Sequence, residues 1–158
     1  MINNDQIWIN ITNELAKFSK CQFTQVACIA VNDSGRIKAT GVNGTPSGMT
    51  NCCDVKFEKR EDHKQWSDDH ELHAEMNMIE DLARSGPCPS KMSIYINISP
   101  CKNCLKHLIG LTKRKGSDKV EIDKIVFGEV YHRLTNDDII NMKSYCAEAN
   151  VILKQVGE

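Results

Sequence analysis

The 158-residue chain has little of what marks membrane, secreted or nucleic-acid-binding proteins. Its longest apolar run, residues 26–31, is far shorter than the roughly 18 residues that span a bilayer. Its start, Met-Ile-Asn-Asn-Asp, lacks the positive and apolar segments of a secretory signal. The net charge is only −1, which argues against a basic surface for nucleic acid. We therefore expect a cytoplasmic protein that binds neither membrane nor nucleic acid, with one domain over residues 1–158.

Cysteine, in contrast, is abundant, with eight residues in the chain. Disulfide-dense domains are usually short and secreted, and this sequence shows no export signal. In a reducing compartment, clustered cysteines more often bind metal, while isolated ones are buried in the core. The count therefore favours a metal site over a disulfide framework.

Hydrophobic periodicity predicts an alternating α/β unit. Helices are predicted over 3–19, 73–84, 101–112 and 136–149, and strands over 26–31, 37–42, 92–98, 121–127 and 151–156. The first two strands form a hairpin, and helices alternate with strands after it. We expect an α/β fold whose mixed sheet becomes parallel and is covered on both faces. The polar stretch over 43–69 is predicted to be a long functional loop.

Two short motifs, each at the start of a predicted helix, form the strongest chemical signal. They are His-Ala-Glu at residues 73–75 and Pro-Cys-Lys-Asn-Cys at residues 100–104. Cys101 and Cys104 face the same way on a first helical turn, and the helix N-terminus favours their thiolates. With His73 they make three zinc ligands, which leave a fourth tetrahedral position open, as in catalytic zinc sites.

Glu75 completes a pattern typical of zinc nucleobase deaminases, in which a glutamate near the metal is the general acid and base. A purely structural zinc site has no need for a carboxylate at this place. Two other interpretations of the cysteine pair stay open: a redox pair, or a closed zinc site with Cys88 or another residue as the fourth ligand.

The resemblance to a known family extends beyond these motifs. Residues 40–48 and 51–54, His-Ala-Glu-Met-Asn at 73–77 and Ser-Pro-Cys-Lys-Asn-Cys at 99–104 resemble deoxycytidylate (dCMP) deaminases, above all the phage-type members. The resemblance covers residues 19–153. It implies a three-layer α-β-α cytidine-deaminase-like fold with a mixed five-stranded sheet. It also implies hydrolysis of dCMP to dUMP and ammonia, which supplies the dUMP precursor for dTMP synthesis.

The resemblance further implies roles for single residues. Glu75 moves protons between water and the base. Ala74 and Ser99 contact the base edges, Asn43 contacts the sugar, and Tyr131 and Arg133 lie in the region that approaches the phosphate. Without the resemblance, Asn43 is better explained as a turn residue before Gly44.

Phage-type members also carry a second, structural zinc, whose ligand positions match Cys21, Cys52, His63 and Glu71 in this sequence. Two thiolates, an imidazole and a carboxylate form an acceptable tetrahedral set. Cys53 and His70 are rival ligands. Sequence reasoning alone places His63 in an exposed loop.

Family members are allosteric, activated by dCTP and inhibited by dTTP, each with Mg²⁺, at a site between subunits. Hexamers are common in the family, so the resemblance implies a homo-oligomer, a hexamer, for this chain as well. By resemblance, the effector region contains Gly44, Asn51 and Asp54, and Arg84 is linked to the substrate response. Asp81 departs from an aromatic residue of some phage relatives.

No catalytic or metal-binding role is expected for the remaining cysteines or for the tryptophans. We expect Cys28 and Cys146 to be buried, Cys88 to be a free thiol in a turn, and Trp8 and Trp66 to be packing residues. Two alternatives to a dCMP deaminase stay open. One is the same chemistry on dCTP, cytidine or an RNA base, and the other is a non-catalytic zinc module that binds nucleotides.

Overall fold

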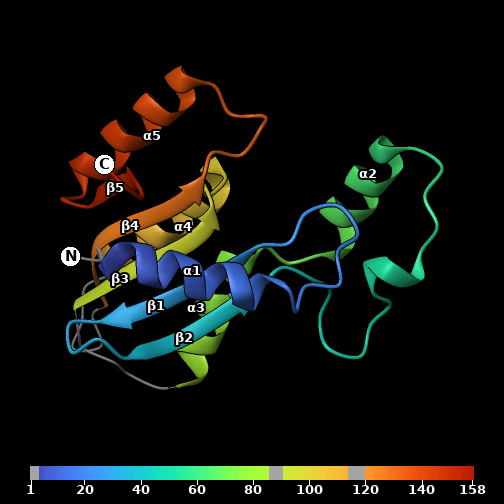
Figure 1. Ribbon diagram of the computed structural model, residues 1–158, viewed down its shortest axis with the longest axis horizontal. Helices are drawn as coiled ribbons and strands as arrows, with labels where there is room; N and C mark the ends of the chain where they lie inside the picture. The colour runs from blue at the N-terminus through green and yellow to red at the C-terminus, as the bar shows by residue number, and fades with distance from the viewer. Residues whose placement is uncertain (1–3, 86–90, 114–119) are drawn as a thin grey trace.

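A mixed five-stranded sheet forms the centre of the protein, which we describe from a computed structural model over residues 4–85, 91–113 and 120–158 (Figure 1). The strand order is β2-β1-β3-β4-β5. The strands are β1 (Ala27–Asn32), β2 (Ile37–Val42), β3 (Lys91–Ile98), β4 (Glu121–Glu129) and β5 (Ile152–Gln155). The helices are α1 (Asn4–Ala16), the 3-10 turn η1 (Cys52–Asp54), α2 (Arg60–His70), α3 (Ala74–Arg84), α4 (Lys102–Lys113) and α5 (Asn136–Glu148).

The sheet changes from antiparallel to parallel at β3. β1 pairs antiparallel with β2 and β3, whereas β3, β4 and β5 run parallel to one another. The carboxyl ends of β3 and β4 therefore meet at one edge of the sheet, where ligands gather in open α/β folds. The α/β class and the mixed five-stranded sheet expected from the sequence are confirmed.

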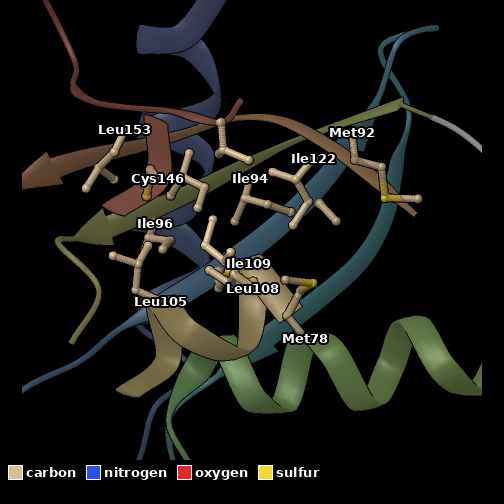
Figure 2. Close-up of a cluster of buried hydrophobic side chains, with 14 of the residues drawn as sticks. Met78, Met92, Ile94, Ile96, Leu105, Leu108, Ile109, Ile122, Cys146 and Leu153 are labelled. Carbon is tan, nitrogen blue, oxygen red and sulfur yellow. The ribbon is translucent and has the colours of Figure 1, made fainter. Parts of the chain in front are cut away.

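The larger core lies between the sheet and helices α3, α4 and α5. Alternate residues of β3, Ile94 and Ile96, point into this layer, where Met78 of α3 and Leu108 of α4 meet them (Figure 2). All four side chains are fully buried. Cys28 and Cys146 belong to the same cluster, so the prediction that they are core residues is confirmed.

A smaller core lies on the opposite face under α1, which crosses the near side of the sheet in Figure 1. Ile9 of α1 packs there with Ile29 and Val126, and Trp8 packs against the cluster as predicted. Helices thus cover both faces, as the three-layer α-β-α prediction requires.

The segment over 43–69, predicted as a loop, contains a helix, so that prediction was wrong. α2 and η1 lie in a lobe beyond the sheet, at the right of Figure 1. α2 has no apolar stripe, because ten of its eleven residues are polar or charged. Its hydrophobic contacts come instead from rings, with Trp66 packing edge-on to Phe57, which lies outside the helix. Trp66 is a packing residue, as expected.

The N-terminal end of α3 is pressed closely onto β2. A Cβ atom on Gly41 would lie 2.1 Å from the carbonyl oxygen of Ala74 and 2.3 Å from the amide nitrogen of Met78. Only glycine permits this approach. Position 41 therefore determines where α3, and with it the motif at residues 73–75, meets the sheet.

Among the residues that the structure describes, no helix is long and apolar enough to cross a bilayer.

Candidate active site and metal centres

The two motifs meet where α3 and α4 begin. His73 is the residue before α3, Cys101 precedes α4, and Cys104 is in its first turn. The Nδ1 atom of His73 lies 3.5 Å from the Sγ of Cys101 and 3.3 Å from the Sγ of Cys104. The structure thus brings together three side chains that are up to 31 residues apart.

This donor set fits a zinc ion. Tetrahedral zinc, with bonds of about 2.3 Å to sulfur and 2.0–2.1 Å to nitrogen, separates the two kinds of ligand by about 3.6 Å. The observed sulfur–nitrogen distances of 3.3 and 3.5 Å are close to that value. The backbone amide of Cys104 donates to the Cys101 sulfur at 3.3 Å, and hydrogen bonds from Cys104 and His73 lower the pKa of Cys101 to about 4. The thiolate that a metal requires is thereby favoured.

Glu75 lies beside this cluster in the first turn of α3 and is only 3 % exposed. Burial raises the pKa of its carboxyl to about 7, although the positive charge of a bound metal ion would oppose that shift. A carboxyl whose pKa is near neutrality can both accept and release a proton at physiological pH.

The cluster opens on a cavity of about 210 Å³. His73, Glu75 and Cys101 line it, and so do all five residues predicted to bind substrate. These are Asn43, Ala74, Ser99, Tyr131 and Arg133.

Hydrogen bonds hold two of these residues in place. The Asn43 amide accepts from the backbone of Val26 at 2.8 Å and donates to the carbonyl of Thr24 at 2.9 Å, so it anchors the chain before β1. The Ser99 hydroxyl accepts from the backbone amide of Tyr131 at 2.9 Å. The connection after β4 is thereby tied to the end of β3, at the sheet edge that the cavity occupies.

A second cluster of metal-ligating side chains lies in the α2 lobe. One ligand atom each of Cys21, Cys52 and His63 falls within 4.8 Å of the others, and all three residues are buried. The Nε2 of His63 is 3.4 Å from the sulfur of Cys21. The sequence-based placement of His63 in an exposed loop was wrong, because α2 turns this side chain inward against the ring of Phe23.

Glu71, the fourth predicted ligand, lies next to this group. One carboxylate oxygen accepts from the Ser67 hydroxyl at 2.5 Å and is 3.9 Å from Nε2 of His63. The other, Oε1, is buried and has no hydrogen-bond partner in the described part of the chain. Because an unpaired buried carboxylate oxygen is costly, its position suits a metal ligand.

The rival ligands lie elsewhere. Cys53 is exposed and its sulfur is 3.8 Å from the carboxylate of Asp54. His70 is exposed, stacks on Trp66 and bonds the Trp66 carbonyl through Nδ1. Cys88, the alternative fourth ligand of the first cluster and the predicted free thiol, lies outside the described residues.

The predicted effector residues are only partly gathered. Gly44 and Asn51 line a shallow groove with Phe18 and Met49, and the Asn51 amide donates to Asp54 at 3.4 Å. Arg84, at the end of α3, does not line this groove. The Asp81 carboxylate accepts from the backbone of Thr40 at 2.9 Å, so it joins α3 to the edge strand β2.

Sequence reasoning missed the contribution of α2 to the cavity. Arg60, Lys64, Ser67 and Asp68 all line it. They recur at spacings of three and four residues, which is the signal of one helix face. That signal was hidden because the face is polar.

Residues 2–116 match the protein-family model of the cytidine and deoxycytidylate deaminase zinc-binding region. The chain belongs to this family. Deoxycytidylate deaminases of enterobacteria phages T4 and T2 are 28 % and 27 % identical to this chain. Each alignment is 159 residues long, gaps included, and covers 79 % of this chain. The matches cover 77 % of the T4 protein and 79 % of the T2 protein.

Solved structures support the same fold for this deaminase-family chain. The crystal structure of dCMP deaminase from cyanophage S-TIM5, in complex with dCMP and dUMP, superposes with a TM-score of 0.70 at 24 % identity. The match covers 99 % of this chain and 98 % of that one. The expected cytidine-deaminase-like fold is confirmed.

Proposed function

We propose that the protein is a zinc-dependent deaminase that hydrolyses dCMP to dUMP and ammonia, and so supplies the dUMP precursor for dTMP synthesis. The observation that carries the proposal is the convergence of His73, Cys101 and Cys104 beside a buried glutamate at one cavity. The names of the phage relatives and the nucleotides in the S-TIM5 complex support dCMP as the substrate.

His73, Cys101 and Cys104 would hold the catalytic zinc, which when bound activates the hydrolytic water as a Lewis acid. Glu75 takes a proton from that water and delivers it to N3 of the cytosine as the water oxygen bonds to C4. A second proton, from the new hydroxyl on C4, passes through the same carboxyl to the amino group. The C4–N bond then breaks, which releases ammonia and leaves the C4 carbonyl of dUMP. Because burial raises the pKa of Glu75 to about 7, its carboxyl can serve first as a base and then as an acid near neutral pH.

The cavity walls orient the nucleotide. The backbone around Ala74 and Ser99 faces the base edges. Asn43 faces the sugar, and its side-chain amide can form further hydrogen bonds there besides those to the backbone of residues 24 and 26. Tyr131 and Arg133 would lie toward the phosphate. Orientation by fixed walls removes much of the entropic barrier to the reaction.

An absorbance assay of the purified protein against dCMP, dCTP and cytidine tests the proposal. We expect the highest kcat/KM for dCMP. A higher value for dCTP or cytidine would replace the substrate but keep the chemistry. No turnover of any cytosine compound by the zinc-loaded protein would favour a non-catalytic nucleotide-binding module.

The role of Glu75 predicts the effect of Glu75→Gln. The amide keeps the shape but cannot carry the proton, so kcat should fall by at least about a hundredfold. Zinc content, measured by elemental analysis, should stay unchanged. Glu80→Gln, an exposed position on the same helix, is the matched control. Substantial turnover by the Glu75 variant would remove this residue from the mechanism.

We further infer that Cys21, Cys52, His63 and Glu71 hold a second, structural zinc that joins the α2 lobe to the end of α1. The burial of the three clustered ligands and the unpaired oxygen of Glu71 support this assignment. Elemental analysis should give about two zinc ions per chain, and a firm value of one would refute it.

Regulation by dCTP and dTTP at the groove around Gly44 and Asn51, within a hexamer, is the remaining part of the proposal. The exposed Phe18 and Met49 beside this groove support a contact between subunits there. Gel filtration measures the oligomer, and dTTP should lower the rate at subsaturating dCMP. A monomer that is indifferent to both nucleotides would overturn this part alone.

A further inference from the structure

One face of α2 forms a polar wall of the catalytic cavity. Arg60, Lys64, Ser67 and Asp68 line the cavity from this face, within reach of the same space as His73 and Glu75. The wall thus brings two cations and one carboxylate, that of Asp68, to the cavity, while the neighbouring Glu71 is assigned to metal binding.

The two cations of this wall differ in what they already contact. The ammonium of Lys64 lies 2.7 Å from the carboxylate of Asp68, so its charge has a partner. Arg60 forms no ion pair with any residue that the structure describes. Its guanidinium lies over the ring of Phe23, 5.6 Å from the centroid.

Arg60 is an exposed residue, and its contact with the ring of Phe23 restrains its guanidinium. Phe23 stands 4.2 Å, centroid to centroid, from the ring of His63, which belongs to the buried Cys21, Cys52 and His63 cluster. The guanidinium therefore lies over a ring that is 39 % exposed on one side and contacts the buried His63 on the other. A cation restrained by such a contact loses less conformational entropy when it binds a ligand than an unrestrained arginine does.

A second guanidinium reaches the same cavity from the connection after β4. Arg133 lines it, and it too forms no ion pair within the described ranges. Two unpaired guanidinium groups at one cavity call for an anionic ligand, and guanidinium geometry matches the oxygens of a phosphate. A phosphate monoester carries between about −1.5 and −2 at neutral pH, which two such groups can balance.

We propose that Arg60 binds the 5′-phosphate of the nucleotide substrate, opposite Arg133, and that α2 is the element that selects nucleoside monophosphates over nucleosides. This inference rests on the proposed deaminase function and adds to it a residue that determines substrate class. The lobe around the second metal cluster thereby acquires a role in recognition as well as in stability.

The test compares ligands with and without phosphate. In Arg60→Ala, KM for dCMP should rise about tenfold or more, since a hydrogen-bonded charge is lost, while kcat changes less than about threefold. By calorimetry, Kd for dUMP should rise by a similar factor and Kd for deoxyuridine should not change. Arg60→Lys, which keeps the charge without the bidentate geometry, should lie between.

Arg36→Ala is the matched control, because it removes the same charge from the exposed β1–β2 hairpin turn. Equal weakening of dUMP and deoxyuridine by Arg60→Ala, or no change in either, would overturn the assignment of Arg60. If the wild-type protein does not act on dCMP at all, the proposed function fails, and the calorimetric comparison still decides whether Arg60 recognises phosphate. If the alanine variant does not fold, the dUMP-to-deoxyuridine ratio of Arg60→Lys decides.

Discussion

At the scale of single residues, one buried carboxylate lies beside each of the two cysteine–histidine clusters. Glu75 is enclosed next to His73 and Cys101, where its raised pKa suits proton transfer. Glu71 is enclosed next to His63, where one oxygen bonds Ser67 and the other is left without a partner. The two residues are four positions apart in sequence, yet Glu75 lies beside His73 at the cavity and Glu71 lies beside the buried His63. Their surroundings, and not their residue type, are the basis for the two different roles proposed for them.

The unpaired oxygen of Glu71 leads to a prediction. Glu71→Gln preserves the shape and a bond to Ser67 but removes the anionic ligand, so affinity for the second zinc should fall by at least about tenfold. Elemental analysis after dialysis against a weak chelator should show content falling from about two ions per chain toward one. Asp69→Asn, an exposed change in the same segment, should retain both ions. Full retention by the Glu71 variant would exclude this carboxylate as a ligand.

At the scale of elements, the site depends on how α3 meets the sheet. The positions of His73 and Glu75 depend on the close contact between the start of α3 and β2, and Gly41 allows that contact. The Asp81 carboxylate reinforces it by accepting from the Thr40 amide of the edge strand. Both contacts belong to the packing of α3 on β2, so a change in that packing should reach the active site.

Gly41→Ala tests this dependence. The added Cβ would overlap the backbone of α3, so the helix must shift, at a cost of about 1–3 kcal/mol in unfolding free energy. Because the shift displaces Glu75, kcat for dCMP should also fall. Gly110→Ala is the matched control: position 110 lies in α4, and the new Cβ would meet no atom within 4 Å beyond the adjoining backbone of its own helix. The change should stabilise by about 0.5–1 kcal/mol. Denaturant unfolding measures both, and equal stability of the two variants would contradict the packing argument.

At the scale of the whole molecule, a buried charge cluster ties α1 to the sheet. Asp5 accepts from Lys124 at 2.6 Å, from Lys154 at 2.8 Å and from the hydroxyl of Tyr95 at 2.8 Å. The three partners come from β4, β5 and β3. Burial alone would raise the pKa of Asp5, but these hydrogen bonds outweigh it and lower the pKa to about 2. Since isolated buried charges are costly, the cluster holds the layers in one arrangement.

The lowered pKa of Asp5 predicts acid sensitivity. Its carboxyl contributes about 2 kcal/mol of stability above pH 4, where the unfolded chain is also ionised, and this contribution is lost as the pH falls through about 2. The difference in unfolding free energy between the wild type and Asp5→Asn should therefore shrink between pH 4 and 2. Asp33→Asn, in the exposed hairpin turn, is the control and should show no such trend. A constant difference for the Asp5 variant would refute the linkage.

Local patterns were enough to predict most of the fold and the first metal cluster. Strand alternation in β3 placed Ile94 and Ile96 on one face, and the structure buries both in the larger core. The spacing of Cys101 and Cys104 follows from one helical turn, which is local geometry. Such features depend on residues close together in the chain, and the sequence by itself therefore determined them.

Only the tertiary structure decided what α2 does. Its polar composition gives no periodic apolar signal, because the helix packs through a few rings and through His63 rather than through a hydrophobic stripe. The second cluster joins Cys21, Cys52 and His63 across 42 residues, and the placement of Arg60 over Phe23 joins the lobe to the cavity. Contacts between distant segments depend on how the whole chain packs, so the sequence could supply the candidate ligands but not the wall that α2 forms at the cavity.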